Sequence, residues 1–550
     1  MKKKVLLIAL LALPLAMSCG KKEEPDTRSD DVVILYTTDV HCAVDKNLGY
    51  AKLEAYKQEM LKSYKYVTLV DSGDFIQGDL IGSFSHGKNI INIMNKMNYE
   101  VAVIGNHEFD YGIDVLSERI SDFNGDILSC NLSYKGNKEN KISAVKPYVI
   151  KTYGDLKIGF VGVTTPDSLS ESTPSVFKED GQIVYSFGNE TTENYYKCIQ
   201  DNIDECNIVA DYTILLTHCG NDEYSHPYGS RDIIANTKGY VAVMDGHSHY
   251  DVVWEMLKNK DNKYIPLCDA GTQLTEFGKC VIHHDGTISI EFIDEFDKSD
   301  KEIEDYVKEM KTDTDAIGNR IVAESDVDLK ITDENGIRMV RSRETTIGNL
   351  VADAYRIVED ADIGFINGGG IRSSVSKGDV KFSDIFAVHP FGNYLMVKNV
   401  KGSQILDYLE HCSRFTKEEY FEGTNPSGEF GGFVQISGLK YTIDTSIENH
   451  VEVDEQENFI RVNGERRVKN VQVLENGNYV AIDENKTYKV SSINYILYED
   501  GNGANMFINE PDLETEVKYD YEVIIEYLTE HLHGNLAEKY SSTEGRITVI

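Results

Sequence analysis

Short apolar runs recur along the first 290 residues, and the segments between them are amphipathic. The runs are rich in Val, Ile and Leu and do not alternate with polar residues, which is typical of strands covered on both faces. Segments 50–64 and 112–122 instead place their apolar residues at helical spacing. The pattern predicts a layered α/β domain whose main strands lie in the runs 32–41, 66–75, 101–110, 157–167, 212–222 and 240–249.

A strongly charged stretch at 301–321 separates this region from the rest of the chain. Its amphipathic, mostly polar character favours a helix that connects two domains. The residues after it predict a helix, a strand and a glycine-rich loop, and 550 residues are more than one hydrophobic core usually supports. We therefore predict a first domain at 32–297, a linker helix at 298–325 and a second α/β domain at 326–550.

The N-terminal segment has the organisation of a secretory signal. Lysines at positions 2–4 precede a short apolar run, and small residues lead into Cys19. The run is too short to span a membrane, and it resembles a bacterial lipoprotein signal with Cys19 as the lipidated residue. We expect a signal peptide at 1–19, a flexible tether at 20–31 and an exported protein held at the cell envelope by a lipid anchor. A plain cleaved signal is the alternative.

The net charge narrows the classes of binding partner, whereas the cysteine spacing reveals no metal-binding motif. The formal net charge is −37, which makes nucleic acid an unfavourable partner on electrostatic grounds. An anionic substrate would need local positive charge from metal ions or a few arginines. The nine cysteines show no CxxC spacing, and their pairing cannot be deduced from the sequence.

Polar side chains gather where the predicted strands end. Mixed carboxylate, amide and imidazole groups without thiolates suit a pair of divalent cations. An isolated Asp or His at a strand end is more often a capping or hydrogen-bonding residue than a metal ligand, but the ordered repetition at successive strand ends favours a site. The candidates are Asp39, His41, Asp74, Asn106, His107, Asp110, His218, His247 and His249.

The order D-x-H, G-D, G-N-H-E, T-H and G-H-x-H resembles the metal-binding blocks of the calcineurin-like metallophosphoesterases. The chain as a whole is similar to the bacterial 5′-nucleotidase/UDP-sugar hydrolase family. The resemblance implies a layered α/β/β/α first domain and an α/β substrate-binding second domain joined by a linker helix.

The resemblance also implies roles for these residues. Asp39, His41 and His249 would hold one metal ion, Asn106, His218 and His247 the other, and Asp74 would bridge the two. His107 would face the phosphate, and Asp110 would orient its ring, so that His107 and Asp110 form the catalytic pair. Two metals sharing a carboxylate suit in-line attack of a bridging hydroxide on phosphorus. Glu108 is expected to be structural, and Mn, Zn, Mg, Fe and Co all remain open as the metals.

In the second domain the resemblance points to residues that would bind the rest of the substrate. Arg343, Asn367 and Arg372 would contact phosphate, ribose or base, and Phe391 would form one wall of a clamp for the base. Near the C-terminus the family has a Gly-Gly-Asp-Gly turn, whereas this chain has "EDGNG" at 499–503. The ribose-binding position is then Asn502 or, displaced, Asp500, and the second ring of the clamp is Tyr495 or Tyr498.

The expected function is release of phosphate from 5′-nucleotides, with cleavage of UDP-sugars as an additional activity to test. A 2′,3′-cyclic-nucleotide phosphodiesterase with 3′-nucleotidase activity would use the same first-domain residues. A surface protein that binds metal and nucleotide without turnover is the non-enzyme alternative.

Overall fold

The computed structural model describes residues 26–179, 182–222, 225–249, 253–417, 429–454, 457–513 and 518–550. The predicted signal peptide and Cys19 lie outside these ranges. Of the tether expected at 20–31, residues 20–25 also lie outside these ranges, and residues 29–31 belong to strand β1 (Ser29–Thr37), where the N–H of Ser29 donates to the carbonyl of Ser63. Among the described helices, none has both the length and the apolar composition that crossing a bilayer requires.

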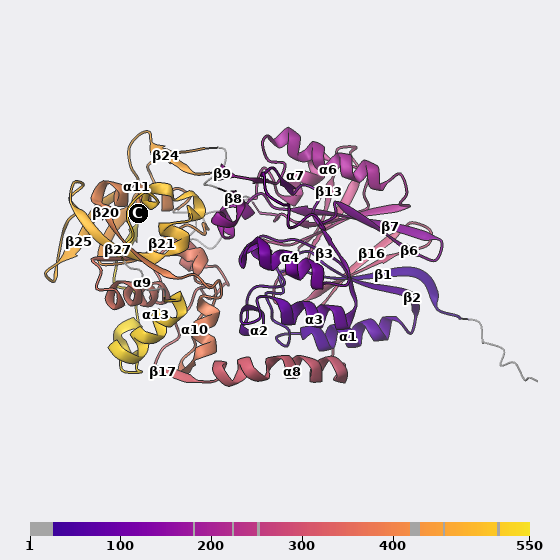
Figure 1. The fold of residues 1–550 in the computed structure, drawn as a ribbon, viewed down its shortest axis with the longest axis horizontal. Helices are drawn as coiled ribbons and strands as arrows, with labels where there is room; N and C mark the ends of the chain where they lie inside the picture. Colours follow the sequence, from indigo (N-terminus) through magenta and orange to yellow (C-terminus); the bar gives the residue numbers. More distant parts are fainter. Residues whose placement is uncertain are drawn as a thin grey trace, which may run out of the picture.

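The chain forms two lobes that lie side by side, and one long helix runs along an edge of the first lobe and ends at the second (Figure 1). The first lobe contains two six-stranded sheets. In the first sheet, β1 to β4 are parallel and β15 is antiparallel to both of its neighbours, β1 and β16. The strands, in spatial order, are β16 (Ile288–Ile293), β15 (Phe277–Ile282), β1 (Ser29–Thr37), β2 (Tyr64–Asp71), β3 (Tyr99–Val103) and β4 (Asp126–Leu128).

The second sheet has parallel central strands and one antiparallel strand at each edge. Buried residues such as Ile34, Phe160 and Met244 join the two sheets in one core, as expected for strands without hydrophobic alternation. The strands, in spatial order, are β13 (Val253–Lys258), β14 (Tyr264–Asp269), β12 (Ala242–Asp245), β11 (Tyr212–His218), β7 (Leu156–Thr164) and β6 (Tyr148–Tyr153).

Helices cover the outer face of each sheet. Leu53 of α1 and Met94 of α3 pack in a core with Val33 and Leu35 of β1. Ile199 of α6 packs against the other sheet. The order helix, sheet, sheet, helix confirms the predicted α/β/β/α layering. The covering helices are α1 (Gly49–Met60), α3 (Lys88–Met97) and α4 (Gly112–Asp122) on the first sheet, and α6 (Thr192–Cys206) and α7 (Ser230–Asn236) on the second.

The charged stretch forms helix α8 (Lys301–Gly318). Asp300 caps it by accepting from the N–H groups of Glu302 and Ile303, and Ile303 and Val307 bury against the first lobe. After the helix, β17 (Ile321–Ser325) pairs with β19 (Gly378–Lys381). The segment 298–325 therefore combines a linker helix with a strand that belongs to the second lobe.

The second lobe has two four-stranded sheets that share one core. The first has the order β20 (Leu395–Lys401), β27 (Thr487–Ile493), β18 (Ile363–Asn367) and β21 (Val434–Ser437). The second has the order β26 (Asn478–Ala481), β25 (Val468–Glu475), β22 (Leu439–Ile443) and β28 (Ile547–Val549). The longer helices among the described residues of this lobe are α9 (Thr346–Val358), α10 (Phe382–Val388), α11 (Gly402–Cys412) and α13 (Asp520–Glu526).

Short elements complete the described chain. The short helices are α2 (Leu80–Ser83), α5 (Ser168–Glu171) and α12 (Asn494–Leu497), and the short strands are β5 (Ser133–Tyr134), β8 (Lys178–Glu179), β9 (Gln182–Ile183), β10 (Tyr185–Ser186), β23 (Val451–Val453) and β24 (Phe459–Val462). Single helical turns are η1 (His107–Phe109), η2 (Pro174–Phe177), η3 (Met339–Arg341), η4 (Gly368–Gly370), η6 (Gly501–Gly503), η7 (Asn505–Phe507), η8 (Tyr527–His531) and η9 (Ala537–Tyr540).

Candidate active site

The candidate metal ligands converge where the parallel strands of the two sheets end. Asp39 and His41 follow β1, Asp74 follows β2, and Asn106 follows β3. The other sheet contributes His218 at the end of β11 and, after β12, the residues His247 and His249. Because the carboxyl ends of parallel strands lie at one edge, the fold brings together groups that are more than 200 residues apart in sequence.

The backbone at these strand ends is unusual. Asp39, His41, Asp74, His247 and His249 all have positive φ angles, of 48°, 45°, 60°, 90° and 57°. Non-glycine residues adopt this region rarely and at a cost, and clusters of such residues mark functional sites. The tight turns aim these five side chains at a common centre.

A neighbouring glycine allows one of these turns. A Cβ atom at Gly246 would lie 1.8 Å from Oγ1 of Thr38 and 2.6 Å from Oδ2 of Asp39. Only a residue without a side chain lets the His247 turn approach Asp39 this closely.

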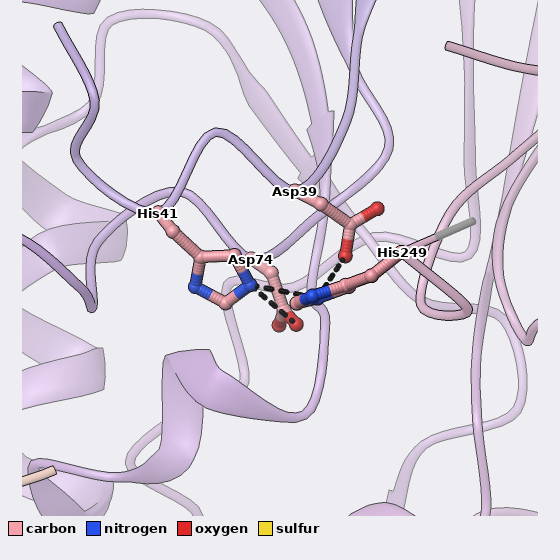
Figure 2. A group of neighbouring side chains, drawn as sticks. All are labelled: Asp39, His41, Asp74 and His249. Carbon is pink, nitrogen blue, oxygen red and sulfur yellow. Dashed lines mark hydrogen bonds and ion pairs between the residues drawn. The ribbon is translucent and has the colours of Figure 1, made fainter. Parts of the chain in front are cut away.

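Four side chains form the first cluster (Figure 2). Ligand atoms of Asp39, His41, Asp74 and His249 lie within 4.8 Å of one another. Nε2 of His249 is 3.1 Å from Oδ1 of Asp39, and Nε2 of His41 is 2.9 Å from Nε2 of His249. Nδ1 of His41 lies 3.1 Å from the carbonyl of Gln77, which directs Nε2 toward the cluster.

The second cluster shares Asp74 with the first. Ligand atoms of Asp74, His218 and His247 again lie within 4.8 Å of one another, and Nε2 of His218 is 3.1 Å from Oδ2 of Asp74. Asn106 completes this group, with its Oδ1 at 2.9 Å from Nδ1 of His247 and 3.2 Å from Nε2 of His218. Its amide nitrogen donates to the carbonyl of Glu171, so the amide oxygen is the atom that faces the imidazoles. Asp74 is thus the carboxylate that the two clusters share.

The electrostatics of the clusters fit divalent cations. Oδ2 of Asp74 is buried, and although His218 lies close to it, the described residues give this oxygen no hydrogen bond of good geometry. Burial lowers the pKa of His218, but the charges of Asp74 and Asp39 outweigh it and raise this pKa to about 10. The two carboxylates therefore favour a positive charge at the position of the His218 ring. A cation provides that positive charge while the imidazole stays neutral, the form in which it is a ligand. Nδ1 of His218 lies 2.7 Å from the carbonyl of Ser72, which orients the ring for this role.

His107 lies outside both clusters and is held by Asp110. Nδ1 of His107 is 2.7 Å from Oδ2 of Asp110, and both side chains are buried. Burial raises the pKa of Asp110. Burial alone would lower the pKa of His107, but the charge of Asp110 outweighs it, so the pKa of His107 lies above its usual value. Because Nδ1 is engaged with Asp110, Nε2 is the ring nitrogen available for proton transfer in the cavity.

Glu108 is expected to be structural, and the structure gives it a specific position. Its Oε2 accepts from the N–H groups of Asp74 (2.9 Å) and Gly105 (2.7 Å), and its Oε1 from those of Phe75 (2.8 Å) and Ile76 (3.2 Å). Burial and the charge of Asp74 raise the pKa of Glu108 to about 7, while these donors oppose the rise. One carboxylate therefore joins the loops that carry two candidate ligands, and no spacing in the sequence reveals this.

A cavity lies between the two lobes, and both contribute to its walls. The first lobe supplies Asp74, Asn106, His107, Asp110, His247 and His249. The second lobe supplies Asn367, Arg372, Phe391, Tyr495 and Asn502, all of them predicted to bind substrate. The two sets of candidates thus meet in one space.

Arg372 and Phe391 reach the metal-binding edge. Nη2 of Arg372 is 3.3 Å from Nδ1 of His249, and its guanidinium lies 5.6 Å from the ring centre of Phe391. Phe391 stacks on His107 with ring centres 5.2 Å apart. Arg338 and Arg341 line the same cavity as Arg372. Burial and these two neighbouring charges lower the pKa of Arg372 to about 9.

Arg343 is predicted to bind substrate, but the structure places Arg338 and Arg341 in the cavity wall and Arg343 outside it. The turn η3 directs the first two toward the cavity, whereas the main chain at Arg343 accepts a hydrogen bond from Gln435. Spacing alone could not select among three arginines within six residues. Glu429, also in the wall, pairs with Arg338 at 2.9 and 2.6 Å.

The C-terminal alternatives lie in different places in the structure. Asn502 lines the cavity, and its Oδ1 is 3.4 Å from Nδ2 of Asn367, whereas Asp500 forms an ion pair with Lys178 at 3.0 Å. Tyr495 lines the cavity, and Tyr498 is 53 % exposed and lies outside its wall.

Two family models match the chain. Residues 32–251 match the calcineurin-like phosphoesterases, and residues 321–509 match the 5′-nucleotidase, C-terminal domain. The chain belongs to the calcineurin-like phosphoesterases that carry a 5′-nucleotidase C-terminal domain. It is a metal-dependent phosphoester hydrolase, and the two Asp/His clusters are consistent with the two divalent metals of that family.

Individual proteins resemble the chain over most of its length. The trifunctional nucleotide phosphoesterase protein YfkN of Bacillus subtilis is 27% identical over 95% of this chain, which spans only 35% of that protein. A snake venom 5′-nucleotidase of Crotalus adamanteus is 25% identical over 94% of this chain and 89% of its own length. The 5′-nucleotidase precursor from Thermus thermophilus has the same fold, with a TM-score of 0.78 at 23% identity over 94% of this chain and 99% of that one.

Proposed function

We propose that this hydrolase removes the 5′-phosphate from nucleotides in the cavity between its lobes. One observation carries the proposal: Asn367, Arg372, Tyr495 and Asn502 of the second lobe line the same cavity as the candidate metal ligands. A phosphate, a ribose and a base require positive charge, hydrogen-bonding groups and an apolar ring, and the cavity wall offers all three. The names of the relatives, which include 5′-nucleotidases, support this substrate class.

In this proposal Asp39, His41 and His249 would hold one cation, Asn106, His218 and His247 would hold the other, and Asp74 would contribute to both sites. When bound, the cations supply positive charge that offsets the phosphate and polarises its phosphorus–oxygen bonds. The guanidinium groups of the second lobe bind the remaining phosphate oxygens and exclude water from them.

His107 is the proton donor of the proposed reaction. With Nδ1 held by Asp110, its Nε2 can protonate the oxygen that leaves phosphorus, and Asp110 stabilises the imidazolium before transfer. Phe391 packs against this ring and limits its rotation. The base would stack between Phe391 and Tyr495, while Asn367 and Asn502 face the ribose hydroxyls.

A substrate panel tests the proposal. Residues 20–550 are stripped of metal with a chelator and restored with Mn²⁺ or Zn²⁺, and phosphate release is measured from 5′-AMP, 3′-AMP, 2′,3′-cyclic AMP and UDP-glucose. We expect the highest kcat/KM for 5′-AMP, dependence on metal, and loss of activity in His107→Ala. A preference for 2′,3′-cyclic AMP or 3′-AMP would replace the 5′-nucleotidase assignment with the phosphodiesterase alternative. Metal binding without any turnover would support a surface binding protein instead.

We also propose that the protein is exported and anchored through a lipid on Cys19. The sequence of residues 1–19 supports this, with basic, apolar and small residues in the order that a lipoprotein signal requires. Metabolic labelling with palmitate should mark the native protein and not a Cys19→Ala variant. Equal labelling of both proteins, or of neither, would contradict the anchor.

A further inference from the structure

Residues 170–173 contact three different parts of the proposed site. They follow strand β7 and include the end of α5 and the two residues after it. Serine, glutamate and threonine in this segment match no motif, so nothing in their spacing selects them as functional residues. Their hydrogen bonds join the His107–Asp110 pair, the amide of Asn106 and the second lobe.

The first contact fixes Asp110. The hydroxyl of Ser172 donates to Oδ1 of Asp110 at 3.0 Å, while Oδ2 faces Nδ1 of His107 at 2.7 Å. The hydroxyl of Thr173 donates to the main-chain carbonyl of Asp110 at 3.3 Å. A carboxylate bonded through only one oxygen can rotate about its terminal torsion, which is soft. With both oxygens engaged, its plane is fixed, and the imidazole ring is fixed with it.

The second contact concerns Asn106. Its amide nitrogen donates to the carbonyl of Glu171 at 3.2 Å, which leaves its oxygen facing His218 and His247. The same short segment therefore orients a candidate metal ligand and the proposed proton donor.

The third contact comes from the second lobe. The hydroxyl of Tyr495 donates to the carbonyl of Ser170 at 2.5 Å. The ring of Tyr495 lines the cavity where a base would stack. The ring and the hydroxyl of this side chain thus have different roles. A phenylalanine would keep the ring and lose the connection.

We propose that Ser172 is a positioning residue for the His107–Asp110 pair, and that the hydroxyl of Tyr495 secures the Ser172 segment through its hydrogen bond to Ser170. This inference rests on the proposed role of His107. Ser172 and Tyr495 then both act on the orientation of the His107–Asp110 pair, so the effects of their substitutions on kcat are coupled.

The kinetic test is a double-mutant cycle in the metal-loaded enzyme, with the phosphate ester that the wild type turns over best. Ser172→Ala should lower kcat on the order of tenfold, the usual effect of losing one hydrogen bond to a charged group, with KM changed less than about twofold. Ser172→Thr, which retains the hydroxyl, should recover most of the loss. Tyr495→Phe should also lower kcat, and the double variant should fall short of the product of the two single effects.

Tyr498→Phe is the matched control, because Tyr498 is exposed and lies outside the cavity wall. It should leave kcat and KM unchanged. A Ser172→Ala variant with wild-type kcat, or with a change confined to KM, would overturn the proposal. Multiplicative effects of Ser172→Ala and Tyr495→Phe would refute the link between them.

A second measurement is independent of turnover. The imidazole N–H of His107 should give a downfield proton NMR signal in the wild-type protein, assigned by its absence in His107→Ala. We expect Ser172→Ala to broaden this signal through faster exchange with water, and Tyr498→Phe to leave it unchanged. An unaltered signal in Ser172→Ala would contradict the positioning role even if no nucleotide proved to be a substrate.

Discussion

Replacing Glu108 with glutamine tests whether one carboxylate joins the two metal-binding loops. Each carboxylate oxygen accepts two backbone N–H groups, four in all. The amide of glutamine keeps one oxygen and turns an NH₂ group toward the other pair, so two buried donors lose their acceptor. An unsatisfied buried donor costs about 1–3 kcal/mol, which gives a loss of about 2–6 kcal/mol. Domains are typically stable by about 5–15 kcal/mol, so the effect is measurable.

The assay is urea unfolding of the metal-free protein, followed by circular dichroism, together with calorimetric titration of Mn²⁺. We expect Glu108→Gln to lower the midpoint of unfolding and to weaken metal binding about 10- to 100-fold, as loss of groups that orient ligands generally does. Glu309→Gln is the matched control, since Glu309 is exposed on helix α8, far from the metal-binding loops in the sequence. It should change stability by less than about 0.5 kcal/mol. Equal stability and equal metal affinity for Glu108→Gln and wild type would refute the reasoning.

Three further predictions concern the cavity wall, the strand ends and the second core. Arg341→Ala should raise KM for 5′-AMP about 10- to 100-fold through loss of charged hydrogen bonds, while Arg343→Ala should leave it within about twofold; equal effects in steady-state kinetics would return Arg343 to the site. Gly246→Ala should abolish stoichiometric metal binding measured by mass spectrometry, because its Cβ would meet a side-chain oxygen at 1.8 Å, and full metal content would contradict that clash. Burial opposes ionisation of Asp353, but Arg546 lowers its pKa from 3.8 to about 2; the folded pKa is the lower one, so about 2 kcal/mol of stability should be present above about pH 4 and lost as the pH falls toward about 2. An acid-unfolding curve of Asp353→Asn that kept this drop would show that another group causes it.

The layered fold and the strand-end cluster follow from local sequence. Apolar runs without alternation predict buried strands, and parallel strands place their carboxyl ends at one edge. Residues at those ends therefore come together whatever the details of packing, which is why Asp39, Asp74 and His218 could be selected from the sequence. The predicted layers and the two clusters agree with the structure.

The rest depends on tertiary contacts that have no local signature. Arg341 ends the turn η3 and lies in the cavity wall, whereas Arg343 follows the turn and lies outside the wall. Glu108 and Ser172 act through bonds to residues 34 and 62 positions away, which neither periodicity nor spacing encodes. The start of β1 at Ser29, inside a polar stretch, likewise comes from pairing with β2.

The left-handed backbone at five candidate ligands has a consequence for how this enzyme can evolve. A non-glycine residue in that region costs about 1–2 kcal/mol relative to a relaxed backbone. Asp39, His41, Asp74, His247 and His249 all bear this cost. Glycine at any one of them would relax the chain while removing a ligand, so drift toward greater stability leads away from catalysis. Selection for activity therefore opposes selection for stability at these positions. Descendants that have lost the ligands are expected to have a higher free energy of unfolding than their active ancestor.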